Sequence, residues 1–524
     1  MKQPSQPLWT AFRMFRFLFF LFIASLVLCQ AAASAPSITL SKTSGPPTSR
    51  IIVSGVGFGP NVGVDIFFDT KDKALVVTNG KGEFHDTGIY APRGARPGEH
   101  WVTALERNND KGAQRPFLVR TNWSQFHFAP SRDGVNRYEN VLNPHTVRSM
   151  SLKWSYSTSD SYVWGSPTVV DGVAYVATWP VLYALGADSG DLRWSVNFCC
   201  PELASSDPTV ADGMLYIGSF DTGLHALDAK TGAALWNYPG LARVFSAPVV
   251  ANGMVFFDDA EDDNGDGVYA LDAKTGKLLW FSPTSSSFSS PAVADGVVYV
   301  GADDNNVYAL DAFTGVELWR YTTDWVVRSS PAIANGVVYV GSWDRNVYAI
   351  NATTGTKLWN YATGDVVESS PAVADGVVYV GSDDHNVYAL DAFTGAKLWS
   401  YTAGDAIGSS PAVANGVVYV GSRDGNVYAL KAATGVRLWS YTTGYAVGSS
   451  PAVANGVVLV GSYGGGKIYS FGRTHSALAK PGLAKRGAVS NHPDPKTLRP
   501  DLNLGVSVPG AREQQSLRGE MGKD

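Results

Sequence analysis

The sequence predicts an all-β protein, on the strength of three observations. One phrase, clearest as SSPAVADGVVYVGSDDHNVYALDAFTGAKLWSYTAG from Ser369 to Gly404, recurs through the C-terminal two-thirds of the chain at a period of about 40 residues. Each copy holds four short segments rich in Val and Tyr, separated by turn residues. A unit of this length cannot bury its own apolar face, so neighbouring units must cover it. Together these features are typical of the blades of a β-propeller.

The segments of one copy predict four antiparallel strands. In the clearest copy they span 369–374, 377–382, 386–392 and 397–402. Asp375 and Gly376 join the first two segments, and such a pair tolerates the positive φ of a tight hairpin. An Asp-Ala-x-Thr-Gly turn joins the last two, where the Asp and Thr side chains can hold backbone N–H groups.

Two incomplete copies predict how the ring closes. The last copy lacks its fourth segment, whereas residues 152–156 (LKWSY) are a fourth segment with no others before it. We therefore expect an eight-bladed β-propeller over residues 151–472, closed by an N-terminal strand that leaves no free edge. The count rests on two landmarks that each occur eight times: Trp154, Trp194, Trp236, Trp280, Trp319, Trp359, Trp399 and Trp439, and Pro167, Pro208, Pro248, Pro291, Pro331, Pro371, Pro411 and Pro451.

Residues 36–121 lack the repeat, and their alternating apolar pattern predicts a small immunoglobulin-like β-sandwich. The segment from Ser44 to Pro60 (SGPPTSRIIVSGVGFGP) resembles TIG/IPT-type domains, although Thr48 stands where Gly is usual. Such a module would act as a spacer or contact a surface or partner. Residues 122–150 are expected to link it to the propeller. Residues 473–524 are rich in Pro, Lys, Arg, Ser and Gly, which predicts a disordered tail.

The N-terminus and the overall charge place limits on localisation and partners. Basic residues, an apolar run over 17–28 and Ala31-Ala32-Ala33 predict a signal peptide over residues 1–33 and an exported protein, secreted or in the periplasm or cell envelope. An uncleaved anchor or lipidation of Cys29 is the alternative, and only these would bring membrane contact. The formal charge of −5 argues against nucleic acid as a partner.

The repeat resembles the PQQ-like repeat family of β-propellers. Its signature A-x-D-x-x-T-G-x-x-x-W is met, for example, by Ala389, Asp391, Thr394, Gly395 and Trp399. That family includes quinoprotein alcohol dehydrogenases and non-catalytic scaffolds such as the propeller lipoprotein of the outer-membrane β-barrel assembly machinery. The resemblance therefore implies the fold and leaves the activity open.

A quinoprotein dehydrogenase needs a carboxylate base, a Ca²⁺ site, a cationic group on the quinone and insertions that build a closed funnel. Successive landmark prolines here are only 40 to 43 residues apart, which leaves little room for insertions, so PQQ is not expected. Cys199 and Cys200 are adjacent, as similar cysteines are in some members of that class. They are interpreted as a disulfide or as two thiols that stabilise a loop.

A second candidate site is a Ca²⁺-binding loop. Asp262, Asn264 and Asp266 follow a D-x-N-x-D-G pattern, in which alternate oxygens converge on the ion. Ala273 stands where the bidentate Glu of such a loop is expected. A plain acidic turn is therefore the alternative.

Comparison among the copies points to one face of the ring. With the strands of a blade lettered A to D, the A–B and C–D turns lie on one face, and the D–A and B–C connections lie on the other. The A–B/C–D face is uniform, whereas the D–A/B–C face varies strongly and mixes aromatic and charged residues, as recognition surfaces do. Drift in solvated loops is the alternative. The candidate partner-binding residues are Trp164, Phe245, Phe288, Arg328, Glu368, Trp343, Arg345 and His385.

These observations predict an exported, non-catalytic propeller that binds a protein, peptide or cell-envelope component through the D–A/B–C face. The alternative function is that of a PQQ- and Ca²⁺-dependent quinoprotein alcohol dehydrogenase. Other enzymes, including sugar-acting ones, stay open.

Overall fold

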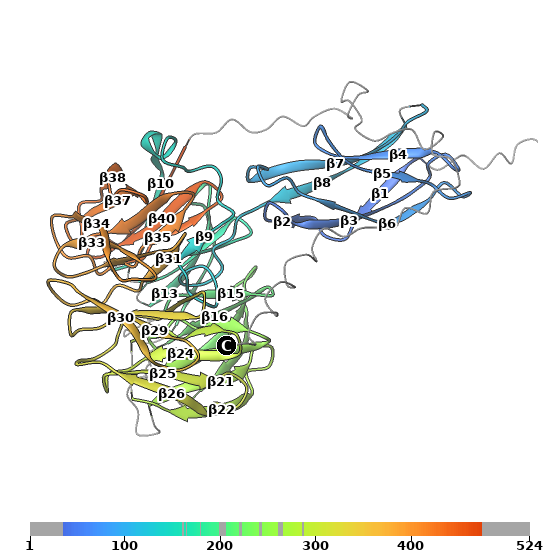
Figure 1. Ribbon diagram of the computed structural model, residues 1–524. Helices are drawn as coiled ribbons and strands as arrows, with labels where there is room; N and C mark the ends of the chain where they lie inside the picture. Colours follow the sequence, from blue (N-terminus) through green and yellow to red (C-terminus); the bar gives the residue numbers. More distant parts are fainter. Residues whose placement is uncertain are drawn as a thin grey trace, which may run out of the picture.

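A computed structural model describes residues 35–109, 111–159, 162–163, 165–178, 180–198, 206–219, 223–239, 244–259, 266–285 and 288–473. Over these residues the chain consists of strands and one 3-10 helix, η1 (Val147–Ser149), which confirms the all-β prediction. The strands form a smaller body and a larger ring of sheets (Figure 1). In this part of the chain no helix is long and apolar enough to cross a membrane. The predicted signal peptide and residues 474–524 lie outside the described residues.

The smaller, N-terminal body consists of two sheets with a common core. Its three-stranded sheet has the order β1 (Ser37–Leu40), β3 (Arg50–Val56), β6 (Phe84–Tyr90). Its five-stranded sheet has the order β2 (Ser44–Gly45), β8 (Gly112–Val119), β7 (Gly98–Glu106), β4 (Gly63–Phe68), β5 (Lys71–Val77). Alternate side chains such as Ile51, Val53 and Phe117 are buried between the sheets. Both sheets fall within residues 36–121, and the TIG/IPT-like assignment stays a prediction.

The larger body contains, within the described residues, eight sheets in which four antiparallel strands follow one another. Sheets 1 to 4 are β11 (Thr168–Val170), β12 (Val173–Ala177), β13 (Val181–Gly186), β14 (Leu192–Asn197); β15 (Thr209–Ala211), β16 (Met214–Gly218), β17 (Leu224–Asp228), β18 (Ala234–Tyr238); β19 (Val249–Ala251), β20 (Met254–Asp259), β21 (Gly267–Asp272), β22 (Leu278–Pro283); and β23 (Ala292–Ala294), β24 (Val297–Gly301), β25 (Asn306–Asp311), β26 (Glu317–Thr322). Sheets 5 to 7 are β27 (Ala332–Ala334), β28 (Val337–Gly341), β29 (Asn346–Asn351), β30 (Lys357–Ala362); β31 (Ala372–Ala374), β32 (Val377–Gly381), β33 (Asn386–Asp391), β34 (Lys397–Thr402); and β35 (Ala412–Ala414), β36 (Val417–Gly421), β37 (Asn426–Lys431), β38 (Arg437–Thr442). Sheet 8 combines β39 (Ala452–Ala454), β40 (Val457–Ser462) and β41 (Lys467–Gly472) with β10 (Ser151–Ser157).

The sheets close into a ring. The first strand of each sheet contacts the first strand of the next, from β11 through β15, β19, β23, β27, β31 and β35 to β39, and β39 contacts β11 again. These first strands therefore lie nearest the axis. The ring is sealed in the predicted way, because β10 pairs antiparallel with β41 from Ser151 opposite Gly472 to Ser157 opposite Lys467.

The landmark Trp of each sheet locks it to the next one. Trp359 donates its indole N–H to the carbonyl of Ala392 (3.0 Å), and its ring lies against Gly395, where a Cβ would come within 2.8 Å of ring atoms. Gly395 has a φ of 73°, so the turn and the packing both require glycine. At the seam, Trp439 donates instead to the carbonyl of Met150 (3.1 Å), just before β10. In the other sheets this acceptor belongs to the C–D turn of the next sheet. At the seam, Met150, which directly precedes β10, supplies it instead.

Residues 123–136, part of the segment predicted as a linker, follow the inside of the ring, and we call them the axial segment. Their carbonyls accept one backbone N–H from the first strand of each of sheets 2, 4, 5, 6 and 7. The donors are Val210, Val293, Ile333, Val373 and Val413, at 2.7 to 2.8 Å. In sheet 1 the segment exchanges two hydrogen bonds with Val169. In sheet 7 it adds the two-residue strand β9 (Val135–Asn136), parallel to β35. The inner edges of the first strands are therefore paired rather than left open.

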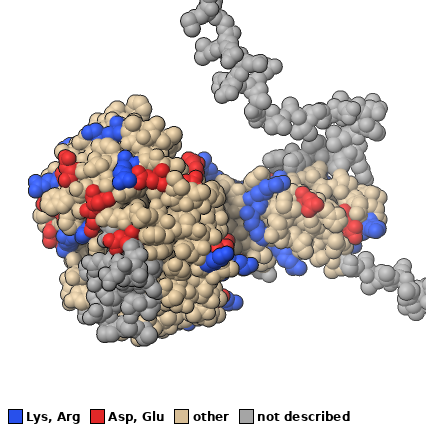
Figure 2. Space-filling view, turned by 90° about the horizontal axis from the view of Figure 1, so that it is seen from below, with Lys and Arg blue, Asp and Glu red and all other residues tan. Residues whose placement is uncertain are grey.

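The two ends of the axial segment meet at the A–B turn of sheet 8. The backbone N–H of Thr121 donates to the side chain of Asn455 (2.7 Å), and Glu139 accepts the N–H of Gly456 (2.9 Å). The chain therefore enters and leaves the ring on the A–B/C–D face, where the N-terminal body also joins it. Figure 2 shows acidic and basic side chains interspersed on the ring, and a group of basic side chains on the smaller body close to the junction.

Candidate functional site

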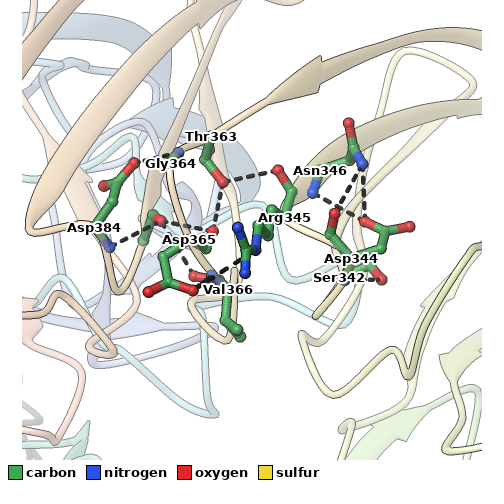
Figure 3. Close-up of polar contacts among 10 residues, drawn as sticks. Ser342, Asp344, Arg345, Asn346, Thr363, Gly364, Asp365, Val366 and Asp384 are labelled. Carbon is green, nitrogen blue, oxygen red and sulfur yellow. Dashed lines mark hydrogen bonds and ion pairs between the residues drawn. The ribbon is translucent and has the colours of Figure 1, made fainter.

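The D–A/B–C face, which lies opposite the entry of the axial segment, is built on carboxylates that hold its turns. In sheet 5, Asp344 accepts the backbone N–H of Asn346 (2.9 Å) and the hydroxyl of Tyr348 (2.6 Å). One repeat later, Asp384 accepts the N–H of Gly364 (2.6 Å) in the preceding D–A connection (Figure 3). In sheets 5, 6 and 7 the Asp of the B–C turn is thereby hydrogen-bonded to the preceding D–A connection. These Asp side chains are structural, and the residues between them are free to vary.

Arg345 and His385, two predicted partner-binding residues, occupy the left-handed place of their B–C turns. Both have a φ of 72°, and sheet 7 has Gly425 at the same place with a φ of 85°. The Nε of Arg345 lies 3.9 Å from an oxygen of Asp365 (Figure 3), and the Nε2 of His385 lies 3.8 Å from Asp405. Contacts this long between exposed side chains contribute little stability. Both side chains are therefore available to a ligand.

Four other predicted residues form one continuous stack, the aromatic–arginine cluster of Phe245, Phe288, Arg328 and Trp343. The rings of Phe245 and Phe288 are stacked with centroids 4.9 Å apart. The guanidinium carbon of Arg328 lies 4.5 Å from the ring centroid of Phe288 and 4.6 Å from that of Trp343. A cation between two aromatic faces is stabilised by the ring quadrupoles. The cluster joins sheets 3, 4 and 5 across the face.

Arg328 is held in this position by a bidentate ion pair with Asp303. Its Nε lies 3.1 Å from one carboxylate oxygen and its Nη2 lies 2.8 Å from the other. Phe288 keeps 45% of its surface exposed, and Trp325, whose ring lies 6.3 Å from that of Trp343, keeps 55%. Among the described residues, the indole N–H of Trp343 has no hydrogen-bond acceptor. The cluster thus presents a rigid apolar surface, beneath which the buried indole N–H of Trp343 is left without an acceptor.

Glu368, the remaining predicted residue within the described part of the chain, belongs to an acidic group beside this cluster. It lies 3.3 Å from Arg423, which also lies 3.5 Å from Asp383. Burial raises the pKa of Glu368, the charge of Asp383 raises it further, and Arg423 opposes both. Burial also raises the pKa of Asp383, which Arg423 lowers and the nearby Asp365 raises again. One arginine therefore serves several crowded carboxylates.

Around the axis, hydrogen bonds from backbone N–H groups to side-chain hydroxyls link neighbouring sheets. In sheets 4 to 8 the N–H of the residue before each landmark Pro donates to the hydroxyl of its counterpart in the next sheet, as Ser370 does to Ser410 (2.9 Å). In sheet 2 the place is taken by Asp207, which accepts the N–H of Ser166 (2.5 Å). Burial raises the pKa of Asp207 to about 6. Sequence reasoning missed this carboxylate, although comparison of the eight copies would have singled it out.

The sequence analysis also missed two buried basic residues of the axial segment, Arg132 and His127. Arg132 donates to the carbonyls of Pro291 (2.5 Å), Phe126 (3.1 Å) and Ala247 (2.7 Å). Burial lowers the pKa of Arg132 to about 9 and that of His127 to about 3, so the arginine is charged and the histidine neutral at pH 7. No motif marks them, because their neighbours come from distant sheets.

Several predicted sites lie outside the described residues. They are Trp164, the cysteines Cys199 and Cys200, and Asp262 and Asn264 of the Ca²⁺ loop; Asp266 is described and directly precedes β21. The Ca²⁺ and disulfide assignments stay predictions. Over the described residues, no group of three or more His, Cys, Asp or Glu side chains could hold a metal ion.

Comparison with known proteins gives a family match within residues 146–478. A family model described as outer membrane protein assembly factor BamB matches residues 146–242, 180–287, 264–368 and 362–478, together more than half of the chain. A 1-butanol dehydrogenase (cytochrome c) of Thauera butanivorans is 33% identical over 143 residues, which cover 24% of this chain and 20% of that protein. Outer membrane protein assembly factor BamB of Salmonella typhimurium is 35% identical over 124 residues, covering 22% of this chain and 31% of that protein.

The chain thus matches less than a third of the length of each of these curated relatives. Among solved structures, a europium-containing methanol dehydrogenase superposes with a TM-score of 0.59 at 15% identity, covering 67% of this chain and 98% of the other. At that identity the likeness concerns the fold alone. The relatives therefore include both an assembly factor and dehydrogenases. A choice between these two functions has to come from the residues of the site.

Proposed function

Because the chain belongs to the PQQ-like repeat family described as outer membrane protein assembly factor BamB, we propose that it is an exported, non-catalytic scaffold that binds a protein or envelope component. The resemblance predicted from the repeat is thereby confirmed. The binding surface in this proposal is the D–A/B–C face. Export is supported by the predicted signal peptide and by a relative named for the outer membrane.

The observation that carries the proposal is the aromatic–arginine cluster. Trp, other aromatic residues and Arg dominate the energetics of protein interfaces. Here the ion pair with Asp303 fixes Arg328 between Phe288 and Trp343, so little side-chain entropy would be lost on binding. An exposed and pre-ordered apolar surface of this kind suits a macromolecular partner.

The described residues do not fit the quinone site that the family resemblance implies for the alternative function. The axial segment pairs with the inner edges of the first strands, so the chain itself takes up space near the axis. Of the arginines on this face, Arg328 already donates Nε and Nη2 to Asp303, and Arg423 contacts Glu368 and Asp383. No quinone-dependent step is therefore assigned to this chain. Incubating the protein with PQQ and Ca²⁺ should yield no alcohol oxidation above background, and activity abolished by a chelator would contradict the scaffold proposal.

Paired substitutions on opposite faces test the binding surface. Phe245→Ala with Phe288→Ala removes the stacked rings, whereas Phe313→Ala with Phe393→Ala removes two phenylalanines that are 63% and 90% exposed on the A–B/C–D face. After cross-linking to an extract of the native envelope, the first variant should lose at least about tenfold of the captured partner, since each ring of a binding hot spot contributes over about 1 kcal/mol. The control should capture as much as the unaltered protein. Equal capture by both variants would reject this face.

A further inference from the structure

The D–A/B–C face of sheets 4 to 7 holds a strong excess of negative charge. Its connections contain ten Asp or Glu residues against three arginines, a formal charge of −7, whereas the whole chain carries −5. These connections are residues 302–306, 323–330, 342–346, 363–370, 382–386, 403–410 and 422–426. The rest of the molecule therefore does not share this excess.

The opposite face of the same four sheets provides an internal comparison. Its A–B turns (295–296, 335–336, 375–376, 415–416) and C–D turns (311–317, 351–357, 391–397, 431–437) contain five acidic and four basic residues, a formal charge of −1. Both faces are made by turns of the same repeat, so repetition alone does not account for the difference. The negative charge is a property of one face.

We call the D–A/B–C face of sheets 4 to 7 the acidic sector. The carboxylates at its centre crowd one another. Asp383 lies among Asp365, Glu368 and Asp405, and each of these neighbours affects the ionisation of Asp383 or is affected by it. Arg423 contacts both Glu368 and Asp383, and Arg328 is taken by Asp303. Among the described residues, one carboxylate oxygen of Asp383 is buried without a hydrogen-bond donor. Arg345 lies 3.9 Å from Asp365 and His385 lies 3.8 Å from Asp405, and both of these contacts are long. The four carboxylates therefore keep an excess of negative charge.

This acidic group lies next to the apolar surface of the cluster. Trp343 and Asp383 occupy the same place of the B–C turn in sheets 5 and 6, which are neighbours in the ring. A ligand that crosses from one sheet to the next would meet the half-buried ring of Trp343 and then the carboxylate of Asp383, one oxygen of which lies 3.5 Å from Arg423. Aromatic faces also attract cations, so both halves favour the same kind of side chain.

We propose that this sector binds a cationic, extended segment of a partner protein, with a Lys or Arg side chain on the acidic group of Asp365, Glu368, Asp383 and Asp405 and an adjacent apolar residue on Trp343. The inference rests on the proposed function and adds the chemistry of the partner. Charge complementarity raises the rate of encounter and excludes acidic competitors. The ammonium or guanidinium would add charge-assisted hydrogen bonds where Glu368 and Asp383 now share the single Arg423.

Fluorescence polarisation with labelled peptides tests the proposal on the full-length protein. The probe is a short peptide of alternating lysine and serine around one tryptophan, and its counterparts carry glutamate or serine in place of lysine. The lysine peptide should bind best, and its affinity should fall as ionic strength rises. The variant Glu368→Gln/Asp383→Asn/Asp405→Asn should bind it roughly tenfold more weakly, as expected for the loss of three partly exposed ion pairs of about 0.5 kcal/mol each.

The matched control is Asp295→Asn/Asp375→Asn on the A–B/C–D face. Sheets 5 and 7 already have Asn335 and Asn415 at that turn, so the fold accepts the change. The control should bind the lysine peptide as the unaltered protein does. Equal binding of the lysine peptide by the triple variant and the control would overturn the proposal.

Two further outcomes would also overturn it while separating it from the proposed function. If the serine or glutamate peptide binds as well as the lysine peptide, and Phe245→Ala/Phe288→Ala abolishes that binding, the face is a binding site of different chemistry. If a synthetic copy of residues 474–524 binds more tightly than any probe, the occupant is the chain's own tail. Unchanged partner capture by the Phe245/Phe288 variant would instead refute the proposed function itself.

Discussion

Replacing Arg132 with Met tests whether the axial segment holds the ring together. Arg132 is 1% exposed, and its guanidinium donates to the carbonyls of Pro291, Phe126 and Ala247. Two of these carbonyls belong to sheets 3 and 4, close to their first strands, and the third belongs to the axial segment. The side chain therefore ties three separate parts of the chain together. Met keeps much of the apolar volume and removes every donor.

The magnitude follows from the three hydrogen bonds. A bond from a charged donor contributes about 1.5–3 kcal/mol, and a buried carbonyl left without its donor costs about 1–3 kcal/mol. Part of this loss is offset because methionine has no charge to desolvate. We expect a net loss of about 3–5 kcal/mol in the free energy of unfolding, as is typical when one partner of a buried charged contact is removed. That is a large fraction of the roughly 5–15 kcal/mol by which domains are stable.

Urea unfolding followed by tryptophan fluorescence measures this loss, because the landmark tryptophans lie in the ring. Arg320→Met is the matched control: Arg320 is 54% exposed and pairs with Glu317, and a surface ion pair of this kind contributes little to stability. Hydrogen exchange gives a local readout, since the amides of Val293 and Ile333 donate to the axial segment and should exchange faster in the Arg132 variant. A variant within about 1 kcal/mol of the control, with unchanged exchange, would refute the reasoning.

Two further predictions concern the packing of the landmark Trp against the next sheet and the N-terminal body. Gly395→Ala should destabilise the ring by about 2–4 kcal/mol in thermal unfolding, through left-handed strain plus collision with Trp359, whereas Gly376→Ala, with a φ of 78° and open space around it, should cost only about 1 kcal/mol; equal losses would rule out the packing role. Both ring nitrogens of His100 lie 2.7 Å from acceptors, a carboxylate oxygen of Asp69 and a backbone carbonyl, and these bonds raise the pKa of His100 despite its burial. The bond from His100 and a backbone N–H likewise lower the pKa of Asp69, although burial alone would raise it. The pair should therefore stabilise the body fully between the unfolded pKa values of about 3.9 and 6.5, and lose that contribution as the pH rises through the raised pKa. Hydrogen exchange of the body at about pH 6 and pH 9 should show this loss in the unaltered protein and not in His100→Gln; identical profiles would contradict it.

Much of the candidate site could be predicted because the copies of the repeat within this one chain can be compared with one another. The uniform A–B and C–D turns and the variable D–A and B–C connections identified the face that carries Phe245, Phe288, Arg328 and Trp343. Their mutual contacts could not be predicted. They join residues roughly one repeat apart or more, and only the angle between neighbouring sheets decides which side chains meet.

The sequence alone determined the strands, their grouping into sheets and the closing role of β10, because the period of about 40 residues repeats a local pattern of apolar positions and turns. The tertiary structure alone decided the path of residues 123–136. That segment binds the first strands mostly through backbone groups, which every residue has, so its side chains gave no signal. The tertiary structure also decided that Glu368 and Asp383 both contact Arg423. These residues come from separate loops, and only the closed ring brings those loops together.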